Sequence, residues 1–582
     1  KEVVNALVTL YHQGKFLLIL EKEKQFVSLY QDSKDILNIL GSTNIAVKNY
    51  KKAITNFNKA IRINPNVPTI YYNLGLAYHH IGNMDDAIEN YKKAIDLKPD
   101  YDEAFCNMGM SLEEKGDLEG AIEKYNKVLE INPKHPGAHM NLGISYVSCG
   151  DYDSAIKNYK IAVDLNPNSD VFLQSLLFNL NYSPDMSAEE IYEYYKQFDQ
   201  RFGLPHKNKW KTFTQPKVPK NKLKIGYVSP DFVEHSVERF LLTALAHHNH
   251  DKFEIFAFAE LENEDKVSQE YKSYVDHWIR TDGMKDDELV QKIRDMEIDI
   301  LVDLAGHTSN NRLTVFAQKP APVSLSWFIG YGYTTGLSAI DYFLTDKVMA
   351  PKGSEHLFSE KLWKLENHSF VWDPGNNNLG QVNNLPALSK GFITFGTLTR
   401  TIRINDRVIK AWADILTKVP NSKLIINSKN FFNDGKSIGN FMLKFRDHGI
   451  AESRLDFYYR TPPWDSMRQI DIALDCFPHN SGTTLMEHLY MGNPFITYSN
   501  RPSVGRIGAS ILTTLGHPEW IATSEEEYVE KAVALASDPQ KLSTIRQNLR
   551  AEMEASPIMD QKGFVRELEG AYQAMWKKWC SS

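Results

Sequence analysis

Small and apolar positions recur with a fixed period in the first third of the chain. The tripeptide Asn73-Leu74-Gly75 returns after 34 residues at Asn107 and after another 34 at Asn141. Other markers with this spacing are a glycine (Gly82, Gly116, Gly150), an alanine (Ala87, Ala121, Ala155) and a proline (Pro65, Pro99, Pro133, Pro167). Four independent markers with one period predict a row of repeated two-helix units.

This unit resembles the tetratricopeptide repeat, which has small residues where its two helices approach and a proline where the second helix ends. Upstream, Leu40-Gly41 and Ala53 keep the register, and Gly14 falls on the turn-glycine position. We therefore expect about four and a half repeats, of which the first are degraded. The sequence predicts an all-α tetratricopeptide-repeat solenoid over residues 1–182, followed by linker helices over 183–221.

Stacked repeats of this kind form a superhelix whose concave face is an extended groove. We expect Asn73, Asn107 and Asn141 to line this face as a ladder of side-chain amides that binds the main chain of a protein or peptide. The alternative is that each asparagine bonds within its own repeat. The repeats also offer a surface through which a homodimer would form.

After a basic, proline-containing linker, the pattern changes to short β-rich runs separated by helical stretches. Alternating strands and helices indicate parallel sheets. The expected strands lie at 224–229, 253–258 and 298–304, and then at 392–396, 423–427, 470–475 and 494–498. They predict two Rossmann-like α/β lobes, 222–385 and 386–582, the second with a C-terminal helix, joined by a crossing segment at 367–390.

Ligands of open parallel sheets bind beyond the carboxyl ends of the strands. Four loops in such places carry polar residues, namely 229–235, 305–308, 396–403 and 475–484. The last loop leads into an expected helix at 485–492. There, Gly482, Thr483 and Thr484 would present backbone N–H groups and hydroxyls at the positive end of the helix, which is the composition of a diphosphate cradle.

Composition excludes several classes of function. The proportions of 42% hydrophobic and 24% charged residues are those of a globular protein. A net charge of −7 disfavours a nucleic-acid partner. The four cysteines form no C-x-x-C pair, which fits a reducing compartment, and no apolar run suggests a membrane span. We expect a cytoplasmic protein.

Cofactor and metal motifs are missing from the second half. It contains neither G-x-G-x-x-G after a strand nor G-x-x-x-x-G-K-[ST]. It also lacks a D-x-D carboxylate pair, so we expect no bound metal and no cofactor. Any charge on a leaving group would then be met by arginine, lysine and helix dipoles. Arg400 and Arg403, three residues apart at a helix start, fit a shared phosphate because like charges so placed repel unless an anion lies between them.

At these loops the sequence is similar to the tetratricopeptide-bearing glycosyltransferases, which comprise the O-linked N-acetylglucosamine transferases and the plant SPINDLY proteins. The resemblance implies a metal-independent, inverting transferase with two Rossmann lobes (GT-B type), whose repeats present a protein acceptor. It implies UDP-N-acetylglucosamine as the donor, and GDP-fucose is the next candidate. A non-catalytic scaffold that senses nucleotide sugars is the rival. The matching motifs are 222–232, 299–308, 320–323, 330–336 and 487–492.

The same resemblance assigns roles to individual residues. His235 matches the family's active-site histidine, and Arg403 stands where the family has a lysine on the donor phosphates. Arg400 replaces a residue that contacts the nucleotide, and Glu487 stands where a carboxylate holds the ribose. Gly482 replaces the histidine of a His-Thr-Thr turn and so removes an imidazole, whereas arginine in place of lysine keeps the charge but presents a planar fork.

Other candidates have structural alternatives. Asp231 or Glu234 would serve as the base in place of His235. His307 is either a donor-binding residue or a loop residue bonded to backbone, and His479 either contacts the base of the donor or only packs. Arg501 and Arg506 flank another loop before a helix and are candidates for diphosphate contact. His247, His248 and His250 are close in sequence, but no carboxylate is spaced to complete a metal site.

Overall fold

The computed structural model describes residues 2–582 except 328, 330–331, 376–378 and 432–434. The chain forms two compact units, Lys1–Asn166 and Pro167–Ser582. The boundary lies before helix α12 (Asp170–Leu180), whereas the solenoid was predicted to extend to residue 182. The structure places α12 with the second unit, where it contacts helix α13 (Ala188–Phe198) and where Asn181 donates to the Tyr195 hydroxyl at 2.7 Å.

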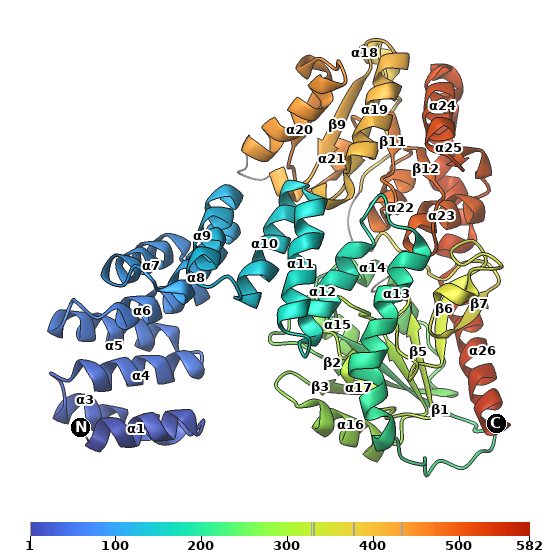
Figure 1. Ribbon diagram of the computed structural model, residues 1–582. Helices are drawn as coiled ribbons and strands as arrows, with labels where there is room; N and C mark the ends of the chain where they lie inside the picture. Colours follow the sequence, from blue (N-terminus) through green and yellow to red (C-terminus); the bar gives the residue numbers. More distant parts are fainter. Residues whose placement is uncertain (1, 328, 330–331, 376–378, 432–434) are drawn as a thin grey trace. The chain divides into compact units, whose positions relative to one another are not determined.

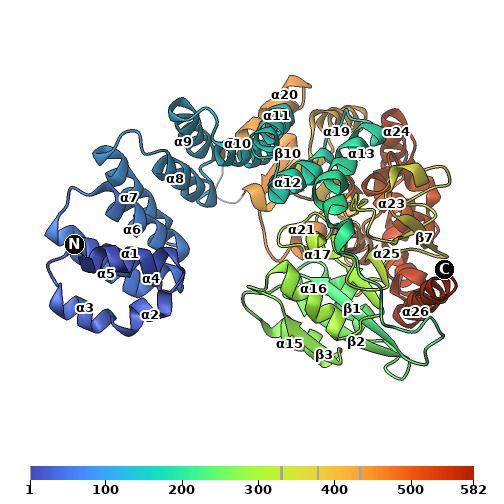
Figure 2. The ribbon, with the colours of Figure 1, turned by 60° about the horizontal axis from the view of Figure 1, so that its bottom comes forward.

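The first unit is a row of antiparallel helix pairs, and successive pairs stack in chain order (Figures 1 and 2). Three shorter helices precede the regular pairs, in agreement with the degraded first repeats: α1 (Glu2–His12), α2 (Phe16–Glu21) and α3 (Glu23–Leu29). The pairs are α4 (Lys34–Ala46) with α5 (Tyr50–Ile63), α6 (Pro68–His80) with α7 (Met84–Leu97), α8 (Asp102–Glu114) with α9 (Leu118–Ile131), and α10 (Pro136–Cys149) with α11 (Tyr152–Leu165).

The repeat markers have the physical roles that the pattern predicted. A Cβ on Gly75 would lie 2.8 Å from the ring of Tyr91 on the second helix, and one on Gly109 would lie 2.6 Å from Tyr125. Only glycine permits this approach. Gly82 has a φ of +77° in the turn between α6 and α7, a conformation that other residues rarely adopt.

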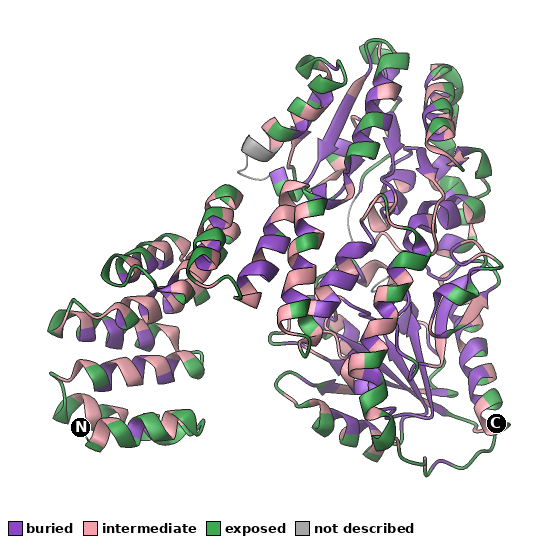
Figure 3. Cartoon of the chain, viewed as in Figure 1, coloured by how far each residue is buried: buried purple, intermediate pink, exposed green. Residues whose placement is uncertain are grey.

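The second unit contains two parallel sheets, whose strands are mostly buried while the covering helices expose their outer faces (Figure 3). Over the described residues the N-terminal lobe has a seven-stranded sheet of order β3-β2-β1-β4-β5-β6-β7. Its strands are β1 (Leu223–Ser229), β2 (Phe253–Ala259), β3 (His277–Arg280), β4 (Ile300–Asp303), β5 (Val323–Trp327), β6 (Tyr342–Asp346) and β7 (Lys361–Leu365). Its helices are α14 (Glu238–Leu245), α15 (Lys266–Ser273), α16 (Asp286–Asp295) and α17 (Leu313–Ala317).

The C-terminal lobe repeats this plan with six strands in the described part of the chain, of order β10-β9-β8-β11-β12-β13. They are β8 (Thr394–Leu398), β9 (Lys423–Asn427), β10 (Leu455–Tyr458), β11 (Ile472–Leu474), β12 (Phe495–Tyr498) and β13 (Ile521–Ala522). The helices are α18 (Pro386–Lys390), α19 (Asp406–Lys418), α20 (Gly435–Asp447), α21 (Trp464–Met467), α22 (Thr483–Tyr490), α23 (Ile507–Leu515), α24 (Glu525–Ala536) and α25 (Pro539–Ala555). The predicted two-lobed α/β fold is confirmed.

The last helix, α26 (Gln561–Cys580), packs against the N-terminal lobe. The Tyr572 hydroxyl lies 2.9 Å from that of Tyr227 on β1, and Glu569 Oε1 lies 3.0 Å from Nδ1 of buried His248. These buried polar contacts fasten the chain end to the first lobe. None of the helices in the described residues is long and apolar enough to cross a membrane.

Candidate functional site

The strand order in each lobe creates a switch point where loops gather. From β1 the chain turns to one side for β2 and β3 and returns to the other for β4, and β8 relates to β11 in the same way. The loops that follow two such neighbouring strands run in opposite directions, and a crevice opens between them at the carboxyl ends of the strands. A cavity of about 460 Å³ lies at these loops, with residues from both lobes in its lining.

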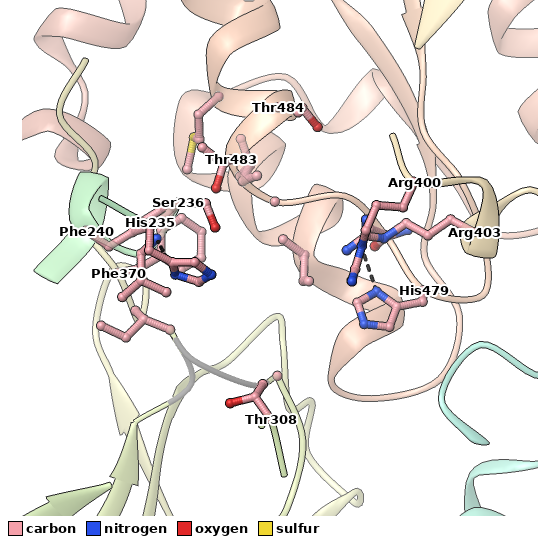
Figure 4. A pocket seen from close by; sticks show the side chains of 18 of the residues that line it. His235, Ser236, Phe240, Thr308, Phe370, Arg400, Arg403, His479, Thr483 and Thr484 are labelled. Atoms are coloured by element: carbon pink, nitrogen blue, oxygen red, sulfur yellow. Dashed lines mark hydrogen bonds between the residues drawn. The ribbon is translucent and has the colours of Figure 1, made fainter. Parts of the chain in front are cut away.

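All four loops singled out in the sequence reach this cavity. The N-terminal lobe contributes His235 after β1 and Thr308 after β4. Facing them across the cavity are Arg400 and Arg403 from the C-terminal lobe (Figure 4). The loop after β11 supplies His479, Asn480, Gly482, Thr483 and Thr484. Of the motif at 330–336, Gly330 and Tyr331 lie outside the described residues, and Gly332 lines the cavity.

The N-terminus of α22 opens into the cavity. Its first N–H groups, including those of Thr483 and Thr484, have no acceptor within the helix and carry the positive end of the helix dipole. Gly482 is the residue before the helix, and a Cβ built on it meets no atom within 4 Å. The helix end therefore offers N–H groups, hydroxyls and open space to an anion.

Asp475 fixes the loop that leads into α22. Its Oδ1 accepts the backbone N–H of Cys476 at 2.9 Å and that of Ser481 at 2.8 Å, while Oδ2 accepts the Thr497 hydroxyl at 2.8 Å. Burial raises the pKa of Asp475 to about 7. This carboxyl is thus occupied in shaping the loop.

Arg400 and Arg403 flank a short turn after β8. Nη2 of Arg400 donates to the Tyr182 hydroxyl at 2.8 Å, and the guanidinium carbon of Arg403 lies 5.9 Å from the centroid of the Tyr182 ring. Nε of Arg403 is buried and has no hydrogen-bond partner among the described residues. A phosphate oxygen is the kind of acceptor that such a group needs.

His479 lies close enough to the arginines for their positive charge to affect its pKa. Its pKa is lowered well below the usual 6.5, chiefly by burial and also by the charges of Arg403, Arg400 and Arg501. The neutral imidazole stacks on Tyr182, with ring centroids 4.5 Å apart and planes 6° apart. Tyr182 and Phe178 also line the cavity; neither was predicted from the sequence, because both lie in the part expected to be solenoid.

His235 projects into the cavity from the loop between β1 and α14, and 46% of its side chain is exposed (Figure 4). Its Nδ1 accepts the backbone N–H of Val237 at 3.4 Å and lies 3.8 Å from Oδ1 of Asp231. Burial raises the pKa of Asp231, and the nearby imidazole opposes that shift. Neither of the alternative bases, Asp231 and Glu234, is among the residues lining this cavity.

Two predicted donor-binding residues do not line the cavity. Nε2 of His307 lies 2.8 Å from the carbonyl oxygen of Thr335, and the ring packs edge-on against Tyr195 and Phe198. Burial lowers the pKa of His307 to about 4. The geometry favours the loop-residue interpretation, because the adjacent Thr308 points to the cavity instead.

Glu487 is the second of these residues. It lies on α22 and is partly buried, and this burial raises its pKa to about 7 although the charge of Arg239 opposes the shift. It retains some exposed surface. Part of the cavity lining is apolar and includes Phe240, Phe370 and Met486. No local sequence signal distinguished these three residues from core residues.

The remaining charged candidates have structural roles. Arg501 donates to the carbonyl oxygens of Asn181 and Met186, both at 2.6 Å, and Arg506 donates to that of Val348 at 2.6 Å. His248 lies 2.8 Å from the Tyr227 hydroxyl. Among the described residues no group of three or more histidine, cysteine and acidic side chains is placed to hold a metal.

The three asparagines of the predicted ladder are half-buried and bond to the preceding repeat rather than within their own. Asn107 Nδ2 donates to the Tyr72 hydroxyl at 2.9 Å, and Asn141 Nδ2 lies 3.6 Å from Cys106 Sγ. Asn73 Nδ2 donates to Asn38 and to Ser42. The three amides therefore link successive repeats, and their use by an acceptor stays a prediction.

Comparisons with known proteins identify both units. The profile described as "Glycosyl transferase family 41" matches residues 198–382 and 379–568. Profiles of the tetratricopeptide repeat match 41–82 and 111–148, and 68–101 and 136–169.

Three relatives illustrate the similarity. A probable UDP-N-acetylglucosamine–peptide N-acetylglucosaminyltransferase SPINDLY of Solanum lycopersicum is 35% identical over 417 residues, 70% of this chain and 44% of the relative. The corresponding SEC protein of Arabidopsis thaliana is 31% identical over 405 residues, 66% and 40% of the two chains. The chain thus spans less than half the length of these curated relatives. A solved structure of a mutant O-GlcNAc transferase of Thermobaculum terrenum, 27% identical, superposes with a TM-score of 0.81 over 88% of this chain and 98% of the other.

Proposed function

The chain belongs to glycosyl transferase family 41, and we propose that it transfers a sugar from a nucleoside-diphosphate donor to serine and threonine hydroxyls of proteins. The printed names of its relatives describe peptide glycosyltransferases. The tetratricopeptide repeats supply an extended surface for a protein or peptide acceptor.

One observation carries the proposal. An electropositive wall, made by Arg400 and Arg403, faces His235 across a single cavity (Figure 4), and the N-terminus of α22 opens into the same cavity. Sugar transfer needs a positive group for the diphosphate, which leaves with negative charge, and a base for the attacking hydroxyl, which loses a proton. A donor whose diphosphate lay on this wall would direct its sugar toward the N-terminal lobe.

For the chemistry, we propose attack of the acceptor oxygen on the anomeric carbon with inversion. The new carbon–oxygen bond forms while the bond from that carbon to the β-phosphate oxygen breaks, and the electron pair stays on the phosphate. Nε2 of His235 takes the hydroxyl proton, because a neutral imidazole is a common general base in proteins. Nδ1 accepts the Val237 N–H in the structure, so Nε2 can act as the base only once the imidazole turns and Nδ1 carries the hydrogen; Asp231 Oδ1, 3.8 Å away, is then the nearest carboxylate for that N–H.

The charge of the leaving diphosphate would be met by the chain itself. The described residues that line the cavity include two arginines and no carboxylate. Fixed cationic and N–H donors aimed at developing charge stabilise a transition state strongly in a site that excludes water. We therefore propose a reaction that needs no bound metal and no cofactor.

The donor sugar is proposed as N-acetylglucosamine from UDP, following the names of the relatives. GDP-fucose is the second candidate, since Gly482 departs from the His-Thr-Thr turn that the resemblance implies and so leaves the identity of the donor open. A catalytically silent, sugar-sensing scaffold is the rival of both. The proposal further includes a cytoplasmic location, with neither nucleic acid nor membrane as a partner.

A donor panel tests the proposal. The full chain would be incubated with UDP-N-acetylglucosamine, GDP-fucose and other nucleotide sugars, with and without a protein acceptor, and released nucleotide would be measured. We expect acceptor-stimulated release from one donor, and equal release in excess EDTA. Loss of release in EDTA with rescue by Mn²⁺ would contradict the metal-free chemistry, and binding of a donor without any release would favour the scaffold.

A further inference from the structure

The segment between α12 and α13 forms part of the wall of the donor cavity. Tyr182, in this segment, contacts three residues of the C-terminal lobe at once. Its hydroxyl accepts the hydrogen bond from Arg400, its ring lies against the guanidinium of Arg403, and it stacks on His479. A residue outside both Rossmann lobes therefore contacts both arginines.

The backbone holds this tyrosine in place. Arg501 donates from its two terminal nitrogens to the carbonyl oxygens of Asn181 and Met186, on either side of Tyr182. The Asn181 side chain donates in turn to the carbonyl oxygen of Leu177 at 2.9 Å. Only 2% of Tyr182 is exposed, so its ring has little freedom to move.

Tyrosine has chemical properties that suit the site. Two guanidinium groups on one turn repel each other, and their long side chains have many rotamers. An aspartate or glutamate would orient them, but it would also neutralise them and compete with a phosphate. A tyrosine offers a hydroxyl acceptor and the negative face of its ring, and it carries no charge. The arginines are held and the wall stays positive.

We propose that Tyr182 is a positioning residue that orients Arg400 and Arg403 for the diphosphate of the donor. This inference rests on the proposed function, because it assumes that the cavity binds a nucleoside diphosphate. It also extends the catalytic unit backwards from the predicted start of the first lobe at residue 222 to include the segment that carries Tyr182.

The test compares a charged ligand with its uncharged part. Isothermal titration would measure binding of the nucleoside diphosphate that the full chain prefers, UDP or GDP, and of the matching nucleoside, uridine or guanosine. Tyr182→Phe removes the hydroxyl and keeps the ring, whereas Tyr182→Leu removes both. Tyr192→Phe is the matched control, since its hydroxyl lies 3.2 Å from Ser359 Oγ and does not contact the arginines.

We expect Tyr182→Phe to weaken diphosphate binding about three- to tenfold and Tyr182→Leu to weaken it further, with nucleoside affinity held. Tyr192→Phe should leave both affinities unchanged. Equal loss of diphosphate and nucleoside affinity would mean that Tyr182 contacts the base, and unchanged affinity in a folded Tyr182→Phe variant would show a merely structural role; either result overturns the inference. A parent chain that binds no nucleoside diphosphate would instead refute the proposed function itself.

Discussion

Nδ1 of His235 and Oδ1 of Asp231 lie 3.8 Å apart, just beyond hydrogen-bond distance, at the edge of the cavity. Side chains in an unliganded site often complete such a bond only when the substrate is present. A small rotation of the exposed imidazole, with loss of the bond that Nδ1 accepts from the Val237 N–H, would let Nδ1 carry a hydrogen and donate it to Asp231, which would leave Nε2 free to take a proton.

The first prediction follows from this pair. Asp231→Asn should lower kcat about tenfold or more while donor affinity holds, because the amide no longer stabilises the imidazolium that forms. Glu234→Gln is the matched control, since Glu234 is the other carboxylate of this loop and should leave kcat unchanged. Steady-state kinetics with a saturating acceptor would measure both. The opposite ranking would make Glu234 the functional carboxylate.

Arg403 should be the larger contributor to the rate. Replacing it with alanine removes a fixed cation from the leaving diphosphate, and groups of this kind are typically worth about 10²–10³ in rate. Arg403→Lys should keep part of the activity, because it restores the charge without the planar fork. Lys410→Ala, an exposed cation on α19 paired with Asp414, is the control. Near-normal turnover of Arg403→Ala, in a chain of unchanged Tm, would remove Arg403 from the site.

The asparagine ladder is tested by separating two reactions of the same protein. If Asn73, Asn107 and Asn141 bind the acceptor main chain, their joint replacement by alanine should reduce transfer to protein far more than hydrolysis of the donor by water. Each hydrogen bond lost from the complex costs about 0.5–1.5 kcal/mol. The acceptor KM should rise, and donor affinity should hold.

Stability needs its own control, because these amides also link neighbouring repeats. Asn90→Ala with Asn158→Ala removes carboxamides that bond within their own repeat: Asn90 bonds Asp86, and Asn158 bonds Ser154 and His139. If the ladder triple and this pair lower Tm alike and protein transfer is unchanged in both, the ladder is structural.

Buried His307 predicts acid sensitivity of the fold. Its folded-state pKa of about 4 lies below the ordinary 6.5, so its contribution to stability is present above pH 6.5 and is lost as the pH falls toward 4. The loss between pH 7 and pH 5 should be about 2 kcal/mol. The free energy of unfolding of His307→Gln should fall by about 2 kcal/mol less than that of the parent between pH 7 and pH 5. The exposed control His356→Gln should show the same fall as the parent. Urea unfolding at both pH values measures the difference, and parallel curves for all three proteins would contradict the assignment.

Periodic features of the sequence predicted the fold well. The glycines at 75 and 109 and the short apolar strands express constraints that neighbouring residues impose, such as a helix–helix approach or a buried parallel strand. Arg400, Arg403 and Thr483 were found for the same reason, because the carboxyl ends of parallel strands meet at one edge whatever the details of packing.

The rest of the site depends on contacts between distant parts of the chain. Tyr182 enters the cavity from a helix pair that looks like a repeat, and nothing in its local sequence signals this. His307 and Thr308 are neighbours, and the turn of the loop alone decides which of them faces the cavity. Three-dimensional packing therefore supplied what periodicity did not.

The central claim is that this cavity moves a sugar onto protein hydroxyls, and mass spectrometry of the acceptor tests it most directly. A candidate acceptor protein would be incubated with the full chain and the donor chosen by the panel, with Arg403→Ala run beside it, and its peptides would then be sequenced. The account predicts one added N-acetylhexosamine, or one deoxyhexose if the donor is GDP-fucose, on serine or threonine with the parent chain and a strongly reduced amount with the variant. An acceptor left unmodified while the donor is bound, or equal modification by the Arg403→Ala chain, would contradict it.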